Sequence, residues 1–223
     1  MMMEPHHFWQ EILPPGPAAP LKHDGFYTAT LADGRRLRLP IRPLPDGRHG
    51  LASLIVNQAS FAVLDALATD LATRLAEFEP DVVVGLPTLG LTLAAEVARK
   101  LGHSRYVPLG TSRKFWYEET LSVPLSSVTT PDQVKRLYMD PRMLPLLVNR
   151  RVALIDDAIS SGRSIRAGLT LLETLGVRPV GIGAAMLQSD RWRDPAQAEG
   201  WSARVRGCFT TPLLERDSHG RWS

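Results

Sequence analysis

The stretch RVALIDDAISSGRS, residues 151–164, constrains the fold of this chain more than any other segment. Its apolar run at 152–155 is typical of a buried strand, and two adjacent acids, Asp156 and Asp157, come directly after it. Small residues then lead into a helical pattern. A buried strand that passes through a tight turn into a helix predicts a unit of a parallel sheet. Such sheets bind ligands at the carboxyl ends of their strands.

Strand-like and helix-like segments alternate along the rest of the chain. Apolar runs predict strands at 81–86, 105–110, 151–156 and 177–187. Apolar residues that recur every three or four positions predict helices at 52–78, 91–102 and 164–176. We therefore predict an α/β fold with a mostly parallel central sheet flanked by helices. Alternation on either side of Asp33 and Gly34 predicts a β-hairpin at 26–41.

Composition and charge narrow the class of function. The 223 residues suffice for one α/β domain, and no apolar run is long enough to span a bilayer. The N-terminus lacks a secretory signal pattern, and a lone cysteine, Cys208, suits a reducing compartment, so we expect a cytoplasmic protein without a membrane partner. The pI near 9.3 accompanies a net charge of only +3. Such a charge suits a small anionic ligand at least as well as DNA, and we expect no nucleic acid partner.

The turn at 160–164 has the chemistry of an anion site. Its backbone N–H groups and small hydroxyls lie at the start of a helix, where the helix dipole favours negative charge. Gly162 permits a close backbone approach, and Arg163 either adds charge or points to solvent. Asp156 and Asp157 repel a phosphate, so they must serve sugar hydroxyls, a metal ion or developing positive charge. A ligand with a phosphate at one end and a ribose beside it satisfies the whole stretch.

Two other interpretations of the acidic pair are weaker. A helix N-cap leaves the apolar run and the Ser-Ser-Gly-x-Ser pattern unexplained. A phosphotransfer receiver domain needs a separate phosphoacceptor Asp at a central strand end, and the segments 81–86 and 105–110 end without one.

The segment VALIDDAISSGRS, 152–164, resembles the loop that binds phosphoribosyl pyrophosphate (PRPP) in the type I phosphoribosyltransferases. Ser164 keeps the hydroxyl of the Thr that closes the family pattern, and Arg163 stands at a frequent Gly. The resemblance covers about residues 50–190 and is closest to the adenine and xanthine branch.

Two further segments carry the resemblance. Residues 82–102 are similar to the family's strand, pyrophosphate loop and helix. Leu89 stands where members often carry a charge, so pyrophosphate contact there relies on Thr88 and backbone amides. Residues 111–130 followed by 135–144 are similar to the flexible catalytic loop, which opens with the basic pair Arg113-Lys114.

The resemblance implies a Mg²⁺-dependent phosphoribosyltransferase of purine salvage that transfers the 5-phosphoribosyl group of PRPP to a nucleobase, adenine favoured, and releases pyrophosphate. It implies PRPP contacts from Asp156, Asp157, Ala158, Ile159, Ser160, Ser161, Gly162, Arg163, Ser164, Thr88, Leu89 and Gly90. It implies catalytic roles for Asp156, Asp157, Arg113, Lys114 and Glu118. Mg²⁺ is expected to be carried mainly by PRPP, with Asp156 and Asp157 as its protein contacts.

Several roles have competing interpretations. The basic pair 113–114 either neutralises the departing pyrophosphate or is a solvated loop charge. The proton of the base would go to Glu118 or to the adjacent Glu119. The catalytic loop is expected to act as a lid over the site. The aromatic residues 115–117 either stack on the base or pack the closed lid. Trp192, Trp201 and Phe209 either stack on the base or pack in the core of a small hood over it.

The family architecture implies three segments and a homodimer. We assign residues 1–50 to an arm and hairpin that contribute to the hood, 51–190 to the core, and 191–223 to a C-terminal hood or tail. In relatives the basic lid residues often reach a neighbouring subunit's site, which implies the dimer. The competing hypothesis is a PRPP-binding regulatory protein without transferase activity. The helix-turn-helix that usually precedes such a fold is not indicated in residues 1–50, whereas an RNA-binding regulator stays open.

Overall fold

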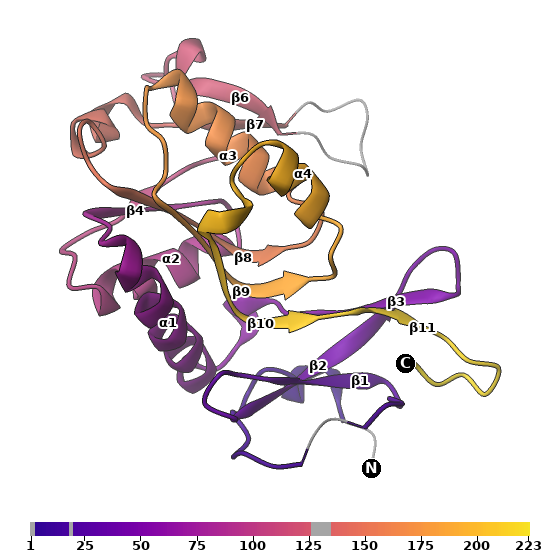
Figure 1. Ribbon diagram of the computed structural model, residues 1–223. Helices are drawn as coiled ribbons and strands as arrows, with labels where there is room; N and C mark the ends of the chain where they lie inside the picture. The colour runs from indigo at the N-terminus through magenta and orange to yellow at the C-terminus, as the bar shows by residue number, and fades with distance from the viewer. Residues whose placement is uncertain (1–2, 18–19, 126–134) are drawn as a thin grey trace.

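A five-stranded parallel sheet forms the centre of the protein, as predicted (Figure 1). The computed structural model describes residues 3–17, 20–125 and 135–223. The strand order is β10–β9–β8–β4–β5, and every pair in it is parallel. The strands are β4 (Val82–Gly85), β5 (Val107–Pro108), β8 (Val152–Ile159), β9 (Gly181–Gln188) and β10 (Val205–Thr211).

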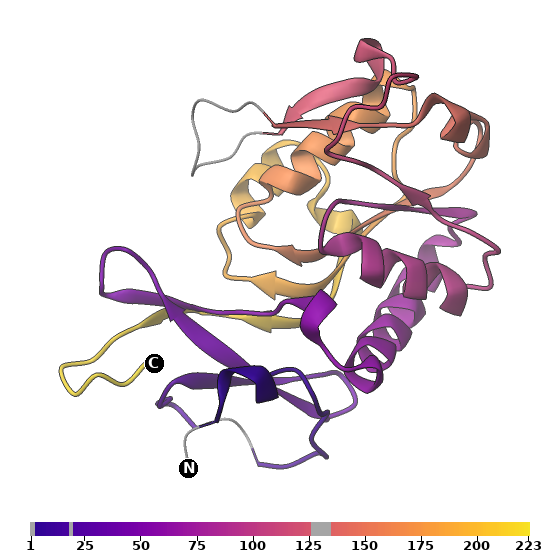
Figure 2. The same ribbon diagram turned by 180° about the vertical axis from the view of Figure 1, so that it is seen from behind.

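Helices cover both faces of this sheet (Figures 1 and 2). Successive side chains of a strand point to opposite faces. Val83 of β4 accordingly packs in the core cluster that contains the buried residues of α1 (Phe61–Leu75) and α2 (Gly90–Lys100). Its neighbour Val84 packs in a second cluster with α3 (Arg163–Thr174). A small hairpin of β6 (Ser122–Leu125) and β7 (Lys135–Tyr138) lies against α3.

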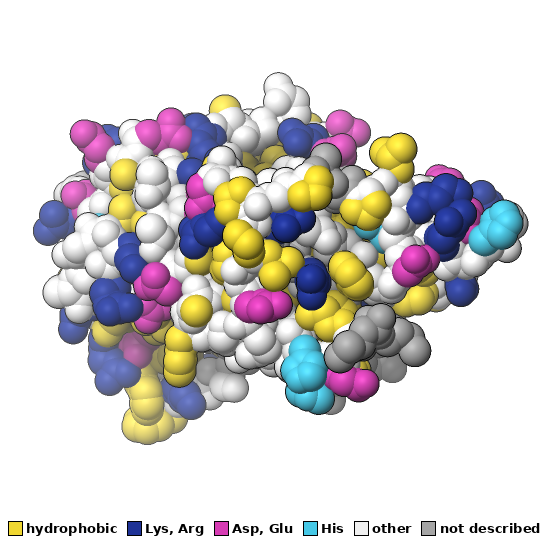
Figure 3. Space-filling view, turned by 90° about the horizontal axis from the view of Figure 1, so that it is seen from below, with side chains coloured by type: hydrophobic (Ala, Val, Ile, Leu, Met, Phe, Trp, Pro, Cys, Tyr) yellow, Lys and Arg dark blue, Asp and Glu magenta, His cyan; other side chains and the backbone are white. Residues whose placement is uncertain are grey.

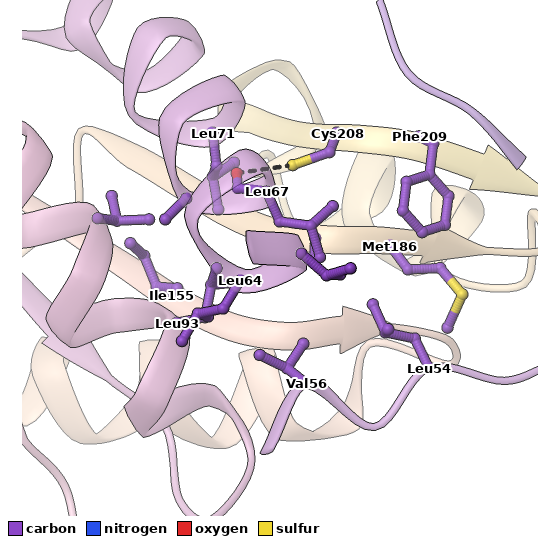
Figure 4. Packing of buried hydrophobic residues seen from close by; sticks show 14 of the residues in the cluster. Leu54, Val56, Leu64, Leu67, Leu71, Leu93, Ile155, Met186, Cys208 and Phe209 are labelled. Carbon is purple, nitrogen blue, oxygen red and sulfur yellow. Dashed lines mark hydrogen bonds between the residues drawn. The ribbon is translucent and has the colours of Figure 1, made fainter. Parts of the chain in front are cut away.

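The largest hydrophobic cluster lies between α1 and the sheet (Figure 4). Leu64, Leu67 and Leu71 recur on one face of α1 and belong to the same cluster as Met186 of β9, and each fully buried leucine contributes roughly 1.5–3 kcal/mol. The Cys208 thiol of β10 donates a hydrogen bond of 3.3 Å to the Leu67 carbonyl oxygen. Burial raises the pKa of this thiol well above its usual value, which keeps it protonated and unreactive.

The first long helix begins later than the predicted start at residue 52. Residues His49–Ala52 form β3, and α1 starts after Ser60, whose side-chain oxygen accepts a hydrogen bond of 3.2 Å from the Val63 amide. Ser60 is therefore the N-cap of α1, and the residues before it do not belong to the helix. Phe61, expected on the apolar stripe, is 89% exposed because it precedes the first buried turn.

A second, antiparallel sheet has the order β1–β2–β3–β11. The predicted hairpin is confirmed as β1 (Phe26–Thr30) and β2 (Arg36–Pro43), and β11 (Leu213–Glu215) pairs with β3. Chain segments near the two termini therefore share one sheet. On the face of the molecule seen from this side, basic, acidic and hydrophobic side chains are interspersed (Figure 3).

The segment after residue 190 contributes to both sheets. Its strand β10 pairs with β9 in the parallel sheet, so the part assigned to a hood or tail supplies an edge strand of the core. α4 (Arg193–Ala198) connects β9 to this strand. Within the described ranges, none of the helices combines the length and apolar character needed to cross a lipid bilayer.

Candidate active site

Asp156 and Asp157 lie inside β8, at the carboxyl end of a central strand. The predicted strand ended at residue 156, but β8 continues to Ile159 because β9 pairs with it up to Leu187. The Asp157 amide donates a hydrogen bond of 2.9 Å to Oδ1 of Asp156. The two carboxyl groups are thus held by the sheet backbone rather than by a mobile loop.

Burial sets the charge of this acidic pair. Asp156 is only 6% exposed, and loss of water around its carboxyl, followed by the charge of Asp157, raises its pKa well above the usual value. Burial also raises the pKa of Asp157. A buried carboxylate without a cation beside it favours the protonated form. Binding a ligand that offers hydroxyl donors or positive charge reverses this preference.

The loop after β4 presses directly on this pair. Leu86 donates its amide hydrogen to the Ile155 carbonyl oxygen at 2.8 Å, which aligns the ends of β4 and β8. A Cβ atom at Gly90 would lie 2.8 Å from both Cα and Oδ1 of Asp156, so only glycine fits here. Thr88 is exposed beside this contact, and the Pro87–Thr88 peptide bond is cis. The structure therefore brings the predicted pyrophosphate loop and the acidic pair together.

The turn from β8 into α3 encloses a small cavity of about 100 Å³. Its lining consists of Ala158, Ile159, Ser160, Ser161, Gly162, Arg163, Ser164 and Ile165. Gly162 adopts φ 78°, a left-handed conformation that glycine reaches without strain. In the part of the chain that the structure describes, no side chain caps α3, so its first N–H groups point at the cavity end of the helix without such a partner. This geometry suits a phosphate.

The basic lid residues lie apart from these loops. Among the described residues, no hydrogen bond or ion pair joins Arg113, Lys114 or Glu118 to residues 156–164. Arg113 instead faces Glu119, with 3.5 Å between Nη1 and Oε2. Arg136 of β7 contacts the same carboxylate at 3.1 Å. The structure thus distinguishes Glu118 from Glu119, because Glu119 forms ion pairs with Arg113 and Arg136.

Aromatic side chains pack the start of the lid. Phe115 is 97% exposed and meets Trp116 edge to face, with 4.8 Å between ring centroids. The Trp116 indole N–H donates to Asp140 at 3.4 Å, and the Arg142 guanidinium lies 4.8 Å above the same ring. Hydrogen bonds from the side chain and the backbone amide of Arg142 hold the pKa of Asp140 at about 2. Trp116, itself 39% exposed, therefore packs against Asp140 and Arg142, while Phe115 is almost fully exposed.

Comparison with known proteins agrees with this geometry. Residues 52–215 match the model of the phosphoribosyl transferase domain, which is most of the chain. The chain belongs to this family of phosphoribosyltransferases.

Proteins of two different names are similar to this phosphoribosyltransferase. It is 34% identical to adenine phosphoribosyltransferase of Acidovorax sp. over 68% of this chain and 80% of that one. It is 30% identical to the bifunctional protein PyrR of Streptomyces coelicolor over 56% of this chain, and the match spans 61% of the PyrR protein. The adenine phosphoribosyltransferase of Giardia lamblia with 9-deazaadenine shares the fold, with a TM-score of 0.61 and 19% identity over 78% of this chain and 93% of that one.

Three residues pack against the turn at 160–164 of this phosphoribosyltransferase: Trp192 and Trp201, which were weighed as base-stacking residues, and Arg191, which was not among the predicted site residues. Trp192 and Trp201 stack with 6.0 Å between ring centroids, and a Cβ atom at Gly162 would meet Trp201 at 3.2 Å. They are 3% and 1% exposed, so they support the turn from below and do not offer a face to a base. Arg191 donates a hydrogen bond of 2.6 Å to Ser160 Oγ. Its distance of 31 positions from Ser160 left no local sequence signal.

Proposed function

We propose that this phosphoribosyltransferase transfers the 5-phosphoribosyl group of PRPP to adenine and releases pyrophosphate. The observation that supports the proposal is the close approach of Gly90 to Asp156, which brings residues 88–90 and the acidic pair to one sheet edge. The 34% identity to an adenine phosphoribosyltransferase supports the choice of base.

The chemistry follows from the residues at this edge. The amides and hydroxyls of 160–164 hold the 5-phosphate, and Thr88 to Gly90 hold the pyrophosphate. The bond between C1 and the pyrophosphate oxygen breaks as a bond from C1 to a ring nitrogen of the base forms. Asp156 and Asp157 accept hydrogen bonds from the ribose hydroxyls and stabilise the positive charge that develops at C1.

The lid residues complete the proposed reaction. Arg113 and Lys114 neutralise the departing pyrophosphate once the lid covers the site, and closure excludes water. Glu118 takes the proton that the base loses, because Glu119 is occupied by Arg113 and Arg136. A second copy of this chain is proposed to receive lid residues in its own site.

Mg²⁺ fits the donor groups of this edge. Mg²⁺ is usually bound by one or two carboxylates together with substrate phosphates, and Asp156 and Asp157 supply the carboxylates. When bound with PRPP, the ion supplies positive charge that favours departure of the pyrophosphate.

The second candidate is a PRPP-binding regulatory protein, and the match to a protein whose name, bifunctional protein PyrR, states two functions supports testing a role other than transfer. The deciding experiment measures pyrophosphate release from PRPP and Mg²⁺ with adenine, guanine, hypoxanthine, xanthine, uracil or orotate. We expect adenine to accelerate release over the control without base. Acceleration by another base would refute the assignment of adenine. PRPP binding without release for any base would support the regulator.

A further inference from the structure

Arg191 is held beside the turn at 160–164, the phosphate turn, by two neutral contacts, one with the turn itself and one with Ser189 at the end of β9. Its Nη2 donates to Ser160 Oγ at 2.6 Å, and its Nε donates to Ser189 Oγ at 3.2 Å. Ser189 is itself fixed: it is 7% exposed, and its amide donates to the Thr211 carbonyl oxygen at 2.7 Å. The guanidinium therefore has a defined position beside the first hydroxyl of the turn.

The charge of Arg191 is not neutralised by its surroundings. Among the described residues, no carboxylate forms an ion pair with it, although Asp190 next to it pairs with Arg193. Hydroxyl partners hold a guanidinium in place and leave its full positive charge. Two of its five N–H donors are used, so three remain for a ligand.

The phosphate turn lacks another fixed cation. Arg163 is the one basic residue within 160–164, and it is exposed without an ion pair or side-chain hydrogen bond in the described parts of the chain. The remaining groups of the turn are amides and hydroxyls. A phosphate monoester carries close to two negative charges at neutral pH, and a guanidinium matches its oxygens in geometry as well as charge.

We infer that Arg191 is a binding residue for the 5-phosphate of the ribosyl substrate, delivered to the turn by Ser160 and Ser189. This inference rests on the proposed function, because it names the cation for the phosphate of PRPP. It places one wall of the phosphate site on the segment between β9 and α4, outside the turn at 160–164. The stacked Trp192 and Trp201 pack against Gly162 of the turn, and Arg191 directly precedes Trp192. The same two rings therefore support the turn and the segment that carries Arg191.

The test compares ribose 5-phosphate and pyrophosphate as calorimetric probes of wild type, Arg191→Ala, Arg191→Lys and Arg193→Ala. Arg193 is the matched control, because it lies on the same segment, stacks 5.1 Å from the Trp192 ring and pairs with Asp190. We expect Arg191→Ala to weaken ribose 5-phosphate binding about tenfold to a hundredfold, and Arg191→Lys to weaken it less. Pyrophosphate affinity and the melting temperature should stay unchanged in both variants.

Three results would overturn the inference: unchanged ribose 5-phosphate affinity in Arg191→Ala, an equal loss for pyrophosphate, or an equal effect of Arg193→Ala. Failure of the proposed function looks different. In that case wild type binds ribose 5-phosphate, and Arg191→Ala weakens this binding, but no base accelerates pyrophosphate release. Wild type that binds neither PRPP nor ribose 5-phosphate would refute both.

Discussion

The acidic and basic halves of the candidate site are built in opposite ways. Asp156 and Asp157 are held in a central strand, are largely buried, and have raised pKa values. Arg113 and Lys114 lie on an exposed segment, and Arg113 is paired with the lid's own Glu119. Fixed groups act without reorganisation, whereas exposed ion pairs are weak and easily exchanged. The acidic half is thus preorganised, and under the proposed function the basic half has to move to reach the pyrophosphate.

The largest effect is expected from Asp157→Asn. If the fixed acid opposes charge at C1, kcat should fall about 10²–10³-fold, the usual range for loss of a preorganised electrostatic contact. The melting temperature should not fall, because the substitution removes a buried charge and keeps a similar shape. Steady-state pyrophosphate release and calorimetric melting measure both quantities.

Glu173→Gln provides the control for this substitution, since Glu173 is exposed on α3. A parallel loss of activity and stability in Asp157→Asn would indicate that the acid is a structural cap rather than part of the chemistry.

A second prediction separates the adjacent glutamates of the lid. Glu118→Gln should lower kcat about 10²-fold if this residue takes the proton of the base. Glu119→Gln should change kcat less than about fivefold, since it breaks only exposed ion pairs to Arg113 and Arg136. The pH profile of kcat would lose its acidic limb in the first variant only. A larger loss of kcat in Glu119→Gln than in Glu118→Gln would assign the role of proton acceptor to Glu119.

The features of the site also differ in how far the sequence predicts them. The acids and the turn at 160–164 were recognisable because they are contiguous and follow an apolar strand. The end of β8 was misplaced by three residues because its length depends on pairing with β9, which is a tertiary contact. The contact of Gly90 with Asp156 joins the start of α2 to β8 and could not be inferred from either segment alone.

Other differences have similar physical causes. The apolar periodicity predicts a first helix that starts too early, because the same pattern continues upstream of Ser60, the residue that caps α1. Trp192 and Trp201 are far apart in the chain from Gly162, so their place below the turn depends on the packing of α3 and α4. Local chemistry is therefore predictable from sequence, whereas support from distant segments is not.

The third prediction concerns the junction between the two loops. Gly90→Ala would place a Cβ atom 2.8 Å from the Asp156 backbone, which forces the loops apart. A displacement of this kind should lower kcat/KM for PRPP about tenfold, because catalysis depends on positions held to within an ångström. Gly110→Ala is the control, since a Cβ atom there meets nothing within 4 Å. Equal activity of both variants would show that the loops act independently.

The smallest effect is a pH dependence of stability. Burial raises the pKa of Asp156 and Asp157 above the unfolded value of about 4, so between these values the folded state binds more protons. Stability conferred by these groups is then present at low pH and is lost as pH rises through the raised pKa. Asp157→Asn should therefore gain melting temperature relative to wild type as pH increases from 4 to 8, by about 2–4 °C for each kcal/mol of removed cost. Saturating ribose 5-phosphate should shrink this gain, because its hydroxyls stabilise the ionised acids in wild type. A difference that is constant with pH would show that the acids are ionised without cost, and the comparison between a buried acidic half and an exposed basic half would lose its electrostatic basis.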